Sequence, residues 1–492
     1  MKETPVTVAS GSSVRRTDSA ELLLLACIIA LMAAAVLRSE PLQSANDRSR
    51  WCTVWSLVER GTWTIDEIDS FRRFSTIDKV RHRLSDQEPW HFYSSKPPLL
   101  STIVAGLYWV ERHTIGLGLF AHTHFVSRLL LVFVNLLPMT FALCSLHRCL
   151  VLLNTTSTTR LFVLATAGFG SMLNPYLTTL NNHTPAAICV IFCLTAMIRI
   201  RQASENTSDP ASAKFSRLDF AILGCCAALS CCFELPAALF SLFCFVYAAR
   251  YSVRHTAAWF VPAALVPLIA FFVTNYLCTG GLKPFYAYYG TDKYVYVHNG
   301  VPSYWSQPRG MDANQESWPV YLFHCVLGHH GIVSLSPVML LTLAGWFSRS
   351  RRRDSSGRTS ADAADNGSGG GHEFDATSLR LLIRAGAVLT VVTLGFYLTR
   401  TANYNYGGNS AALRWMLWLT PFWWFAMIPA LEVIADRKRW FVCALLLLAL
   451  SVFTAGWSQD RPWKPSWLFE TLQQSGWIHY ASFGTNSTEF HA

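Results

Sequence analysis

The first candidate for chemistry is Asp47, which lies in the stretch NDRSRW, residues 46–51, directly after the first apolar run. A carboxylate within hydrogen-bond reach of a hydroxyl group can act as a general base, which contributes roughly 10²–10⁴-fold to a rate. An Asp here also has a purely structural explanation, because it could cap a helix that begins near Ser49. Residue type and spacing leave both roles open.

Histidine and cysteine are the other residue types that could do chemistry. His91, His183, His329 and His330 fall in or beside the polar segments between apolar runs. No pair has the spacing of metal ligands on one helix, and no Cys/His pattern resembles a zinc site. We therefore interpret these histidines as polar residues of hydrated loops. Most of the 14 cysteines lie inside apolar runs, where Cys packs as a small apolar side chain.

The elements that must position these residues are long apolar runs. Of the 492 residues, 52% are hydrophobic and 14% are charged, whereas a soluble domain has about a quarter charged residues. A helix needs about 20 apolar residues to cross a bilayer, and a helix satisfies its backbone within one segment. The runs are 22–37, 129–153, 161–180, 186–200, 220–249 (long enough for two short helices), 259–277, 332–347, 381–398, 413–434 and 441–457.

These runs predict an all-α integral membrane protein with about 10–11 transmembrane helices, and they exclude a soluble enzyme. The formal net charge is +10, and the basic residues alternate between the two sides of successive runs. This positive-inside pattern places the N-terminus in the cytoplasm and argues against a nucleic-acid partner. The basic clusters are Arg15-Arg16, Arg148/Arg160, Arg199/Arg201/Lys214/Arg217, Arg250/Arg254, Arg349–Arg353 and Arg437-Lys438-Arg439.

The resulting map has a cytoplasmic tail, 1–20, and a polytopic membrane domain, 21–457. The segments predicted outside are 39–124, 278–320 and the C-terminal tail 458–492, and a Ser/Ala/Asp/Gly-rich stretch, 349–379, is predicted to be a flexible cytoplasmic linker. After the first span, which ends at Arg38, spans are expected near 125–148, 161–179, 184–200, 218–233, 235–250, 257–277, 331–348, 380–399, 412–434 and 440–457.

Two assignments in this map depend on the charge pattern and on turn residues. Glu234-Leu235-Pro236 is interpreted as a tight turn between two short helices. Residues 97–112 are interpreted as a helix on the outer surface, because a span here would put the later basic clusters on the wrong side.

The two outside segments could carry a site. In the first, Trp51, Val54, Trp55 and Val58 share one face of a predicted amphipathic helix suited to the lipid–water boundary. The second, 278–320, is rich in aromatic residues, which suit sugar rings and lipid headgroups alike. We expect this second segment to cover a substrate cleft.

The order of these features resembles the GT-C superfamily of glycosyltransferases, nearest to aminoarabinose transferases and protein O-mannosyltransferases. The features are an acid after the first span (Asp47), a surface helix ending at Gly61, and the sequence KPPL at 96–99 before an interfacial helix. Further similar stretches are FVSRLL at 125–130, NNHT at 181–184, the Gly-containing span 224–236, YGG at 406–408 and the Arg-to-Pro segment 414–421.

The resemblance implies an enzyme that transfers a sugar from a polyprenyl phosphate to a lipid, glycan or protein acceptor on the outer face of a bacterial-type cytoplasmic membrane. Asp47 would be the general base. Fixed positive charge would stabilise the departing phosphate, although Lys and Arg near span ends also snorkel to headgroups. The implied substrate-binding residues are Lys96, Arg414, Arg128, Arg400, Asn182, His183 and Glu234.

Three positions depart from the family pattern. Arg48 stands where aminoarabinose-type relatives usually carry a second acid, Glu234 stands where Lys is common, and Asn182 replaces an Asp. These changes leave the donor sugar, the acceptor and the participation of a divalent metal ion open.

Three other functions compete with this one. A secondary transporter would show internal repeats and ionisable groups near mid-membrane, whereas here the polar residues collect at one side. An envelope polysaccharide polymerase or ligase typically has its largest outside loop late in the chain, whereas here the first is the longest. A purely structural membrane protein is the third alternative.

Overall fold

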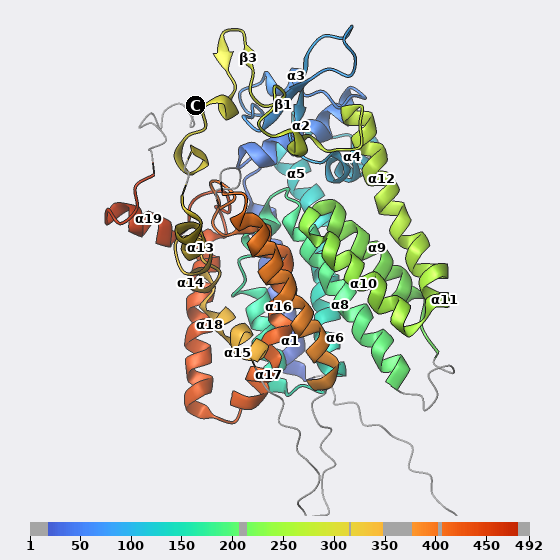
Figure 1. Cartoon of the computed structure of the whole chain (residues 1–492), viewed down its shortest axis with the longest axis vertical. Coiled ribbons are helices and arrows are strands. Elements are labelled where there is room, and N and C mark those ends of the chain that lie inside the picture. The colour runs from blue at the N-terminus through green and yellow to red at the C-terminus, as the bar shows by residue number, and fades with distance from the viewer. Residues whose placement is uncertain (1–17, 206–213, 314–315, 348–375, 402–405, 481–492) are drawn as a thin grey trace, which may run out of the picture.

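The computed structural model describes residues 18–205, 214–313, 316–347, 376–401 and 406–480 of the chain. In these ranges the protein is an all-α bundle with two short β-hairpins (Figure 1). Seven of the described helices are long and apolar enough to cross a membrane, so the prediction of a multi-pass all-α membrane protein is confirmed. The N-terminal tail, nearly all of the predicted linker and the last twelve residues lie outside the described residues.

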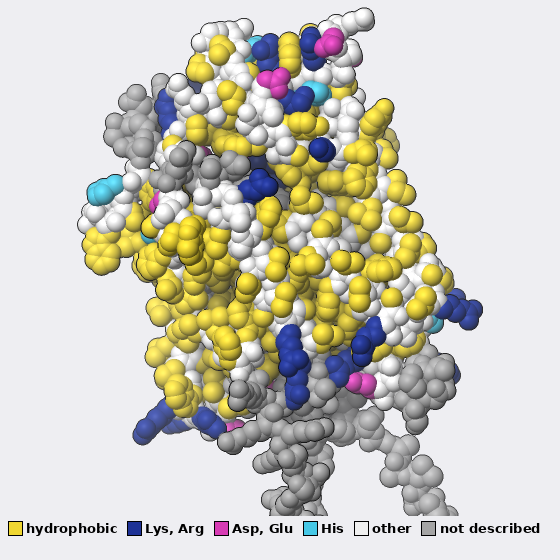
Figure 2. Space-filling model, viewed as in Figure 1, with side chains coloured by type: hydrophobic (Ala, Val, Ile, Leu, Met, Phe, Trp, Pro, Cys, Tyr) yellow, Lys and Arg dark blue, Asp and Glu magenta, His cyan; other side chains and the backbone are white. Residues whose placement is uncertain are grey.

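Three of the seven long helices consist of adjoining segments of different helix type, in which a π or 3₁₀ segment continues directly into an α-helix. The seven are α1 (Ser19–Arg38), α5–η1–α6 (Thr123–Leu131, Val132–Leu136, Leu137–Leu152), α8 (His183–Glu205), α11–η5–α12 (Val253–His255, Thr256–Phe260, Val261–Thr279), α16 (Ala376–Leu398), η10–α17 (Arg414–Leu419, Thr420–Ile434) and α18 (Lys438–Ser458). Figure 2 shows a broad hydrophobic surface around the middle of the bundle, with Lys and Arg side chains gathered towards its two ends.

Helix α8 forms the centre of the bundle. Of its apolar window 89% is buried inside the protein, whereas α12 at the edge is only 22% buried. Helices α6, α9 (Arg217–Phe233), α10 (Ala238–Tyr251) and α17 pack around α8. The first residues of α8 therefore lie in the middle of one end of the bundle.

Two shorter segments refine the predicted map. A turn at Glu234 separates α9 from the 3₁₀ segment η4 (Leu235–Ala237) and α10, as predicted. The segment predicted as a helix at 331–348 is instead divided at Ser336 and Pro337 into α14 (Ile332–Leu335), η9 (Pro337–Met339) and α15 (Leu340–Phe347).

The continuous helix predicted over 161–179 is wrong. Helix α7 (Ser157–Gly168) ends early, and buried irregular backbone leads to the 3₁₀ segment η2 (Pro175–Thr178). Side-chain amides replace the missing helical hydrogen bonds: Asn174 donates to the Gly168 carbonyl (2.7 Å), and Asn135 donates to the Leu177 and Thr179 carbonyls (3.0 and 2.9 Å). Irregular backbone at this depth is tolerated because protein surrounds it.

The two long segments that the sequence predicts to lie outside, called the first and second outside segments, gather at one end of the bundle, which we call the loop end (Figure 1). It contains α2 (Ala45–Glu59), α3 (Asp66–Asp69), α4 (Pro98–Thr114), and the antiparallel pair β1 (Lys79–His82) and β2 (His91–Ser94), in which Lys79 lies opposite Ser94. The second outside segment adds the antiparallel pair β3 (Val297–His298) and β4 (Val301–Pro302). A hydrogen bond from the Arg81 N–H to the Lys293 carbonyl (2.9 Å) connects the two segments. The remaining described elements are η6 (Phe285–Tyr288), η7 (Tyr304–Ser306), η8 (Gly310–Ala313), α13 (Trp318–Val326) and α19 (Trp467–Gln474).

Helix α2 differs from its prediction in two ways. It begins at Ala45, with Ser44 as the N-cap, four residues before the expected start near Ser49. Every residue from Ser49 to Ser56 is buried, so α2 is enclosed by protein and does not lie along a lipid boundary with one apolar face. Polar side chains on α2 therefore face other protein groups.

Candidate functional site

Asp47 occupies the first turn of α2 and is 1% exposed. Its carboxylate accepts hydrogen bonds from the backbone N–H groups of Gln43 (3.1 Å) and Leu180 (3.3 Å). Ser44 is the N-cap of this helix, so the proposed capping role of Asp47 at a later helix start is wrong. Asp47 instead connects α2 to the segment that leads into α8.

Burial also changes the acidity of Asp47. Desolvation raises the pKa of this carboxyl to about 6, although the two backbone N–H groups and Arg50 oppose the shift. A base is most effective when its pKa lies near the working pH, because it is then ionised and still binds a proton well. Asp47 meets this requirement near neutral pH.

Arg50, one turn after Asp47 and 3% exposed, begins a polar chain between three helices. Its Nη2 donates to Asn182 Oδ1 (2.5 Å), and Asn182 Nδ2 donates to Glu234 Oε1 (2.6 Å). The Nδ1 atom of His183 shares the same Glu234 oxygen. This chain joins α2, the start of α8 and the turn after α9.

Lys96 and Asp78 form a second, largely buried part of the site. Lys96 Nζ lies 2.6 Å from Asp78 Oδ2, and Ser95 Oγ donates to the other carboxylate oxygen. Burial raises the pKa of Asp78, but Lys96, Ser95 and Arg50 outweigh burial, so that the pKa is lowered overall. Burial lowers the pKa of Lys96, helped by the neighbouring positive charges of Arg50 and Arg414.

Arg414 enters the site from the start of η10. Its Nε donates to the Gly407 carbonyl (2.8 Å), and its guanidinium lies 5.0 Å from the centre of the Trp463 ring. Gly407 has φ of +88°, and a Cβ there would lie 2.8 Å from Arg414 Nε. Glycine is therefore required both for the backbone conformation and for the close approach of Arg414.

The second outside segment contributes Asp312. Tyr304 OH donates to Asp312 Oδ2 (2.7 Å), and burial raises the pKa of Asp312. The charges of Arg414, Lys96 and Asp78 all act on Asp312. The expectation that this segment covers a cleft is consistent with this placement, although it stays a prediction.

Six of the residues suggested by the sequence thus lie together at the loop end. They are Asp47, Lys96, Asn182, His183, Glu234 and Arg414. Together with Arg50, Asp78 and Asp312 we call them the polar cluster. Its positive groups are two guanidiniums and one ammonium, and its negative groups come from four different segments of the chain.

Arg128 and Arg400 lie elsewhere. Arg128 donates to the Ser39 carbonyl (2.8 Å) and the Arg38 carbonyl (3.2 Å), so it binds the C-terminal end of α1, where a cation is favourable. Arg400 is exposed, with its guanidinium 5.8 Å from the centre of the Phe396 ring. Neither arrangement supports the substrate-binding role that the sequence suggested.

Three members of the polar cluster were missed by sequence reasoning. Arg50 carried a usable signal, because a residue three positions after Asp47 lies on the same helix face. Asp78 and Asp312 had none: Asp78 lies in an irregular segment and Asp312 in the short 3₁₀ segment η8, and both meet the cluster only through tertiary folding.

Two carboxylates of the cluster pair with basic side chains, Asp78 with Lys96 and Glu234 with His183. Among the residues that the structure describes, no group of three or more His, Cys, Asp or Glu side chains is arranged to hold a metal ion. The participation of a divalent metal, which the sequence left open, therefore gains no support from the donor set.

Neither guanidinium of the cluster has a carboxylate partner. Within the described part of the chain, no carboxylate oxygen lies within 4.0 Å of a nitrogen of Arg50 or Arg414. The carboxylates of Asp78, Asp47 and Glu234 act on Arg50 from a greater distance, and the two guanidiniums, one buried and one half-buried, have the charge to bind an external anion. Phosphate fits this role because guanidinium groups bind it bidentately.

A comparison of the sequence with protein-family models and with curated proteins finds no match. The function must therefore be argued from this geometry.

Proposed function

We propose that this protein is a membrane glycosyltransferase of the GT-C type, which transfers a sugar from a polyprenyl-phosphate donor to a lipid, glycan or protein acceptor. The observation that carries the proposal is a buried carboxylate with a pKa of about 6, Asp47, beside two guanidiniums that lack a carboxylate partner, Arg50 and Arg414. A base and an anion site are the two elements that such a transfer needs.

The chemistry assigns one role to each element. Asp47 takes the proton of the acceptor hydroxyl as its oxygen forms a bond to the anomeric carbon of the sugar. The bond between that carbon and the phosphate oxygen breaks, and the electron pair stays on the phosphate. Arg414, Arg50 and Lys96 stabilise the charge that develops there, in a place where burial strengthens each interaction.

The proposed topology places the loop end outside the cell membrane and the opposite end in the cytoplasm. In this topology the seven long helices and four shorter segments containing α7, α9, α10 and α15 would make eleven passes. Basic residues on the opposite end, including Arg437, Lys438 and Arg439 at the start of α18, support this orientation through the positive-inside pattern. The site would then face the compartment in which lipid-linked sugars are used.

The test is release of polyprenyl phosphate from a mixture of radiolabelled polyprenyl-phosphate sugars by the purified protein in membranes. We expect wild type to transfer sugar and Asp47→Asn to be slower by about 100-fold or more. Asp86→Asn is the matched control, because Asp86 is an acid of the same predicted outside segment whose side chain is 94% exposed and pairs only at the surface, with Arg83. If wild type consumes none of the donors, the proposal is wrong and the transporter and structural alternatives come first.

A further inference from the structure

Arg50 is held in the polar cluster by neutral oxygen atoms. Its Nη1 atom donates to both oxygens of Asn46, the backbone carbonyl (3.1 Å) and the side-chain oxygen. Its Nη2 atom donates to Asn182 Oδ1 (2.5 Å). Asn46 lies one turn before Arg50 on α2, and Asn182 lies directly before α8. The guanidinium is therefore fixed between two segments of the chain, and neither contact reduces its charge.

Asn182 connects Arg50 to Glu234 and keeps their charges apart. Its Nδ2 atom donates to Glu234 Oε1 (2.6 Å) and to the Phe233 carbonyl (3.0 Å), while its Oδ1 atom accepts from Arg50. The partners fix this orientation of the amide, because a guanidinium can only donate and a carboxylate can only accept. An Asp at this position would pair with Arg50 and place its carboxylate against that of Glu234.

The carboxylate of Glu234 is occupied by two donors. Glu234 is 5% exposed, and the Oε1 atom that accepts from Asn182 also accepts from His183 Nδ1. These bonds hold Glu234 at the Nδ2 side of the amide, whereas Arg50 lies at its Oδ1 side. Glu234 therefore acts on Arg50 only from a greater distance.

Two N–H groups of Arg50 are left for a ligand. A guanidinium has five N–H groups, and the bonds to Asn46 and Asn182 use three of them. The Nε–H and the second Nη2 N–H have no hydrogen-bond partner among the residues that the structure describes. Arg414, whose charge acts on Arg50, is likewise held by a neutral oxygen, the Gly407 carbonyl. Charged guanidiniums with donors to spare are well suited to bind a phosphate group.

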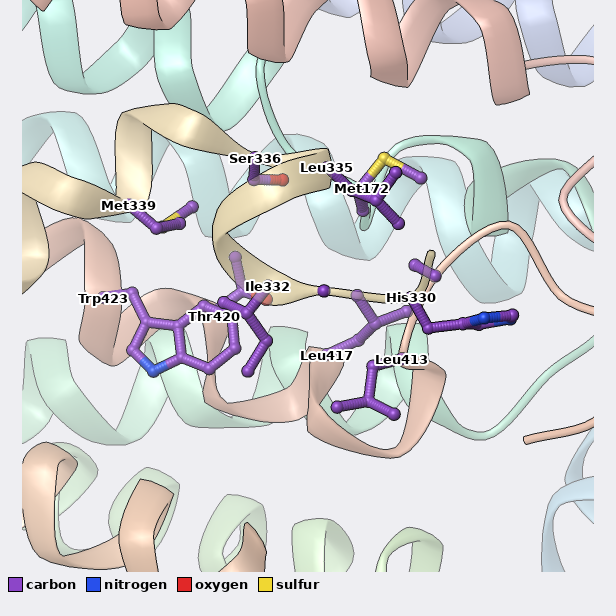
Figure 3. Close-up of a pocket in the computed structure, with 12 residues that line it drawn as sticks. Met172, His330, Ile332, Leu335, Ser336, Met339, Leu413, Leu417, Thr420 and Trp423 are labelled. Carbon is purple, nitrogen blue, oxygen red and sulfur yellow. The ribbon is translucent and has the colours of Figure 1, made fainter. Parts of the chain in front are cut away.

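The cavity beside α14 does not suit an anion. It has a volume of about 30 Å³ and is lined mostly by apolar side chains such as Met172, Leu335 and Trp423 (Figure 3). No Lys or Arg lines this cavity, and burial of a charged group without a partner is costly. A phosphate group is therefore better matched by the guanidiniums of Arg50 and Arg414.

We propose that Asn182 positions Arg50 for the phosphate group of the polyprenyl donor. The Asn182 oxygen holds the guanidinium, and the amide separates it from Glu234, so that the charge and two N–H groups of Arg50 stay available to the phosphate. Asn182 acts through Arg50, and this role differs from the direct substrate contact that the sequence suggested. The inference rests on the proposed function and extends it to the residue that preserves the charge of the anion site.

The test is calorimetric titration of the full-length protein, in mild detergent micelles, with farnesyl phosphate, a short prenyl phosphate. The main variant carries both Asn182→Asp and Glu234→Gln. This exchange leaves the net charge unchanged but places a carboxylate next to Arg50. We expect the exchanged protein to bind farnesyl phosphate at least about tenfold more weakly than wild type, because charges act strongly on their neighbours in a poorly hydrated site.

Two further variants separate the charge at position 182 from other effects. Glu234→Gln alone keeps the Asn182 amide and should bind farnesyl phosphate at least as tightly as wild type, since it removes a negative charge. Asn299→Asp is the control for a new acid at the loop end, because Asn299 is exposed in the turn between β3 and β4. It should leave the affinity unchanged.

Thermal unfolding of each variant shows whether it is folded. If the exchanged protein does not fold, Asn182→Ala takes its place. Without the amide, Arg50 can reach Glu234, so binding should weaken, and addition of Glu234→Gln to this variant should restore it. A loss that Glu234→Gln does not restore would overturn the proposal.

The order of affinities decides the outcome. The proposal is also overturned if the folded exchanged protein binds as tightly as wild type, if Glu234→Gln alone weakens binding to the same extent, or if wild type does not bind farnesyl phosphate. Binding requires no sugar transfer, so a wild type that gives the expected order but transfers no sugar contradicts the proposed function only. Transfer by wild type, together with equal binding by the exchanged protein, contradicts the role of Asn182 only.

Discussion

Asp47→Asn should change the pH dependence of stability as well as the activity. The carboxyl has a pKa of 3.8 when unfolded and about 6 when folded, so the folded state holds a proton that the unfolded state releases. A folded-state pKa raised in this way contributes stability below pH 4, which is lost as the pH rises towards 6. The shift of about two pKa units corresponds to about 3 kcal/mol at pH 7.

The Asn side chain does not ionise, so it avoids this loss, but it has only one oxygen for the backbone N–H groups of Gln43 and Leu180. Leaving one buried donor without a partner costs about 1–3 kcal/mol at any pH. Relative to wild type, the variant should therefore be less stable at pH 4 and gain about 3 kcal/mol between pH 4 and pH 7.

The assay is equilibrium unfolding of the purified protein in mild detergent micelles at pH 4 and pH 7, with Asp86→Asn as the control that should show no such difference. The sign is the important result, because removal of an ordinary salt-bridged Asp would have the opposite pH dependence. If Asp47→Asn loses stability equally at both pH values, the carboxyl is not raised in pKa and the base assignment fails.

Two further substitutions test the cationic side of the polar cluster. Lys96→Met leaves Asp78 buried without its partner, so it should lower the free energy of unfolding by about 3 kcal/mol and also reduce sugar transfer. Lys96→Arg should recover most of the free energy of unfolding but not the full rate of transfer, because a guanidinium does not reproduce the geometry of the ammonium group. Denaturant unfolding and the transfer assay measure the two effects. Gly407→Ala should slow transfer by roughly tenfold or more, because the new Cβ displaces Arg414 and small displacements of positioning groups are costly to catalysis. Gly290→Ala is its control, since Gly290 has a similar φ of +83° but open space around it, and equal loss in both variants would show that backbone strain alone explains the effect.

The site shows what sequence reasoning can reach in a membrane protein. Runs of apolar residues and the alternation of basic clusters give the depth of each residue along the bundle axis. That depth, together with the resemblance to GT-C enzymes, selected Asp47, Lys96 and Arg414, which the structure brings together. It does not give the position around the axis, which is why Arg128 and Arg400 were selected at the same depth although they lie outside the polar cluster.

The errors in the fold have a related cause. Hydropathy stays high from Leu161 to Leu180 although the helix ends at Gly168. One of the two amide side chains that satisfy the irregular backbone, Asn174, lies within this run, and the other comes from a distant part of the chain. This other residue, Asn135, lies on η1, more than forty residues before the carbonyls it binds. Helix α2 was similarly expected at a lipid boundary. Its sequence shows an apolar face, but it does not show that other segments of the protein cover the polar face as well.

The decisive experiment for the proposed function is the pH profile of sugar transfer from polyprenyl-phosphate donors. Wild type should gain activity as the pH rises through about 6, where Asp47 ionises, and Asp47→Asn should remain slower by about 100-fold or more with no inflection there. A wild-type protein that transfers no sugar at any pH, or an Asn variant that transfers with the same profile as wild type, would contradict the proposal.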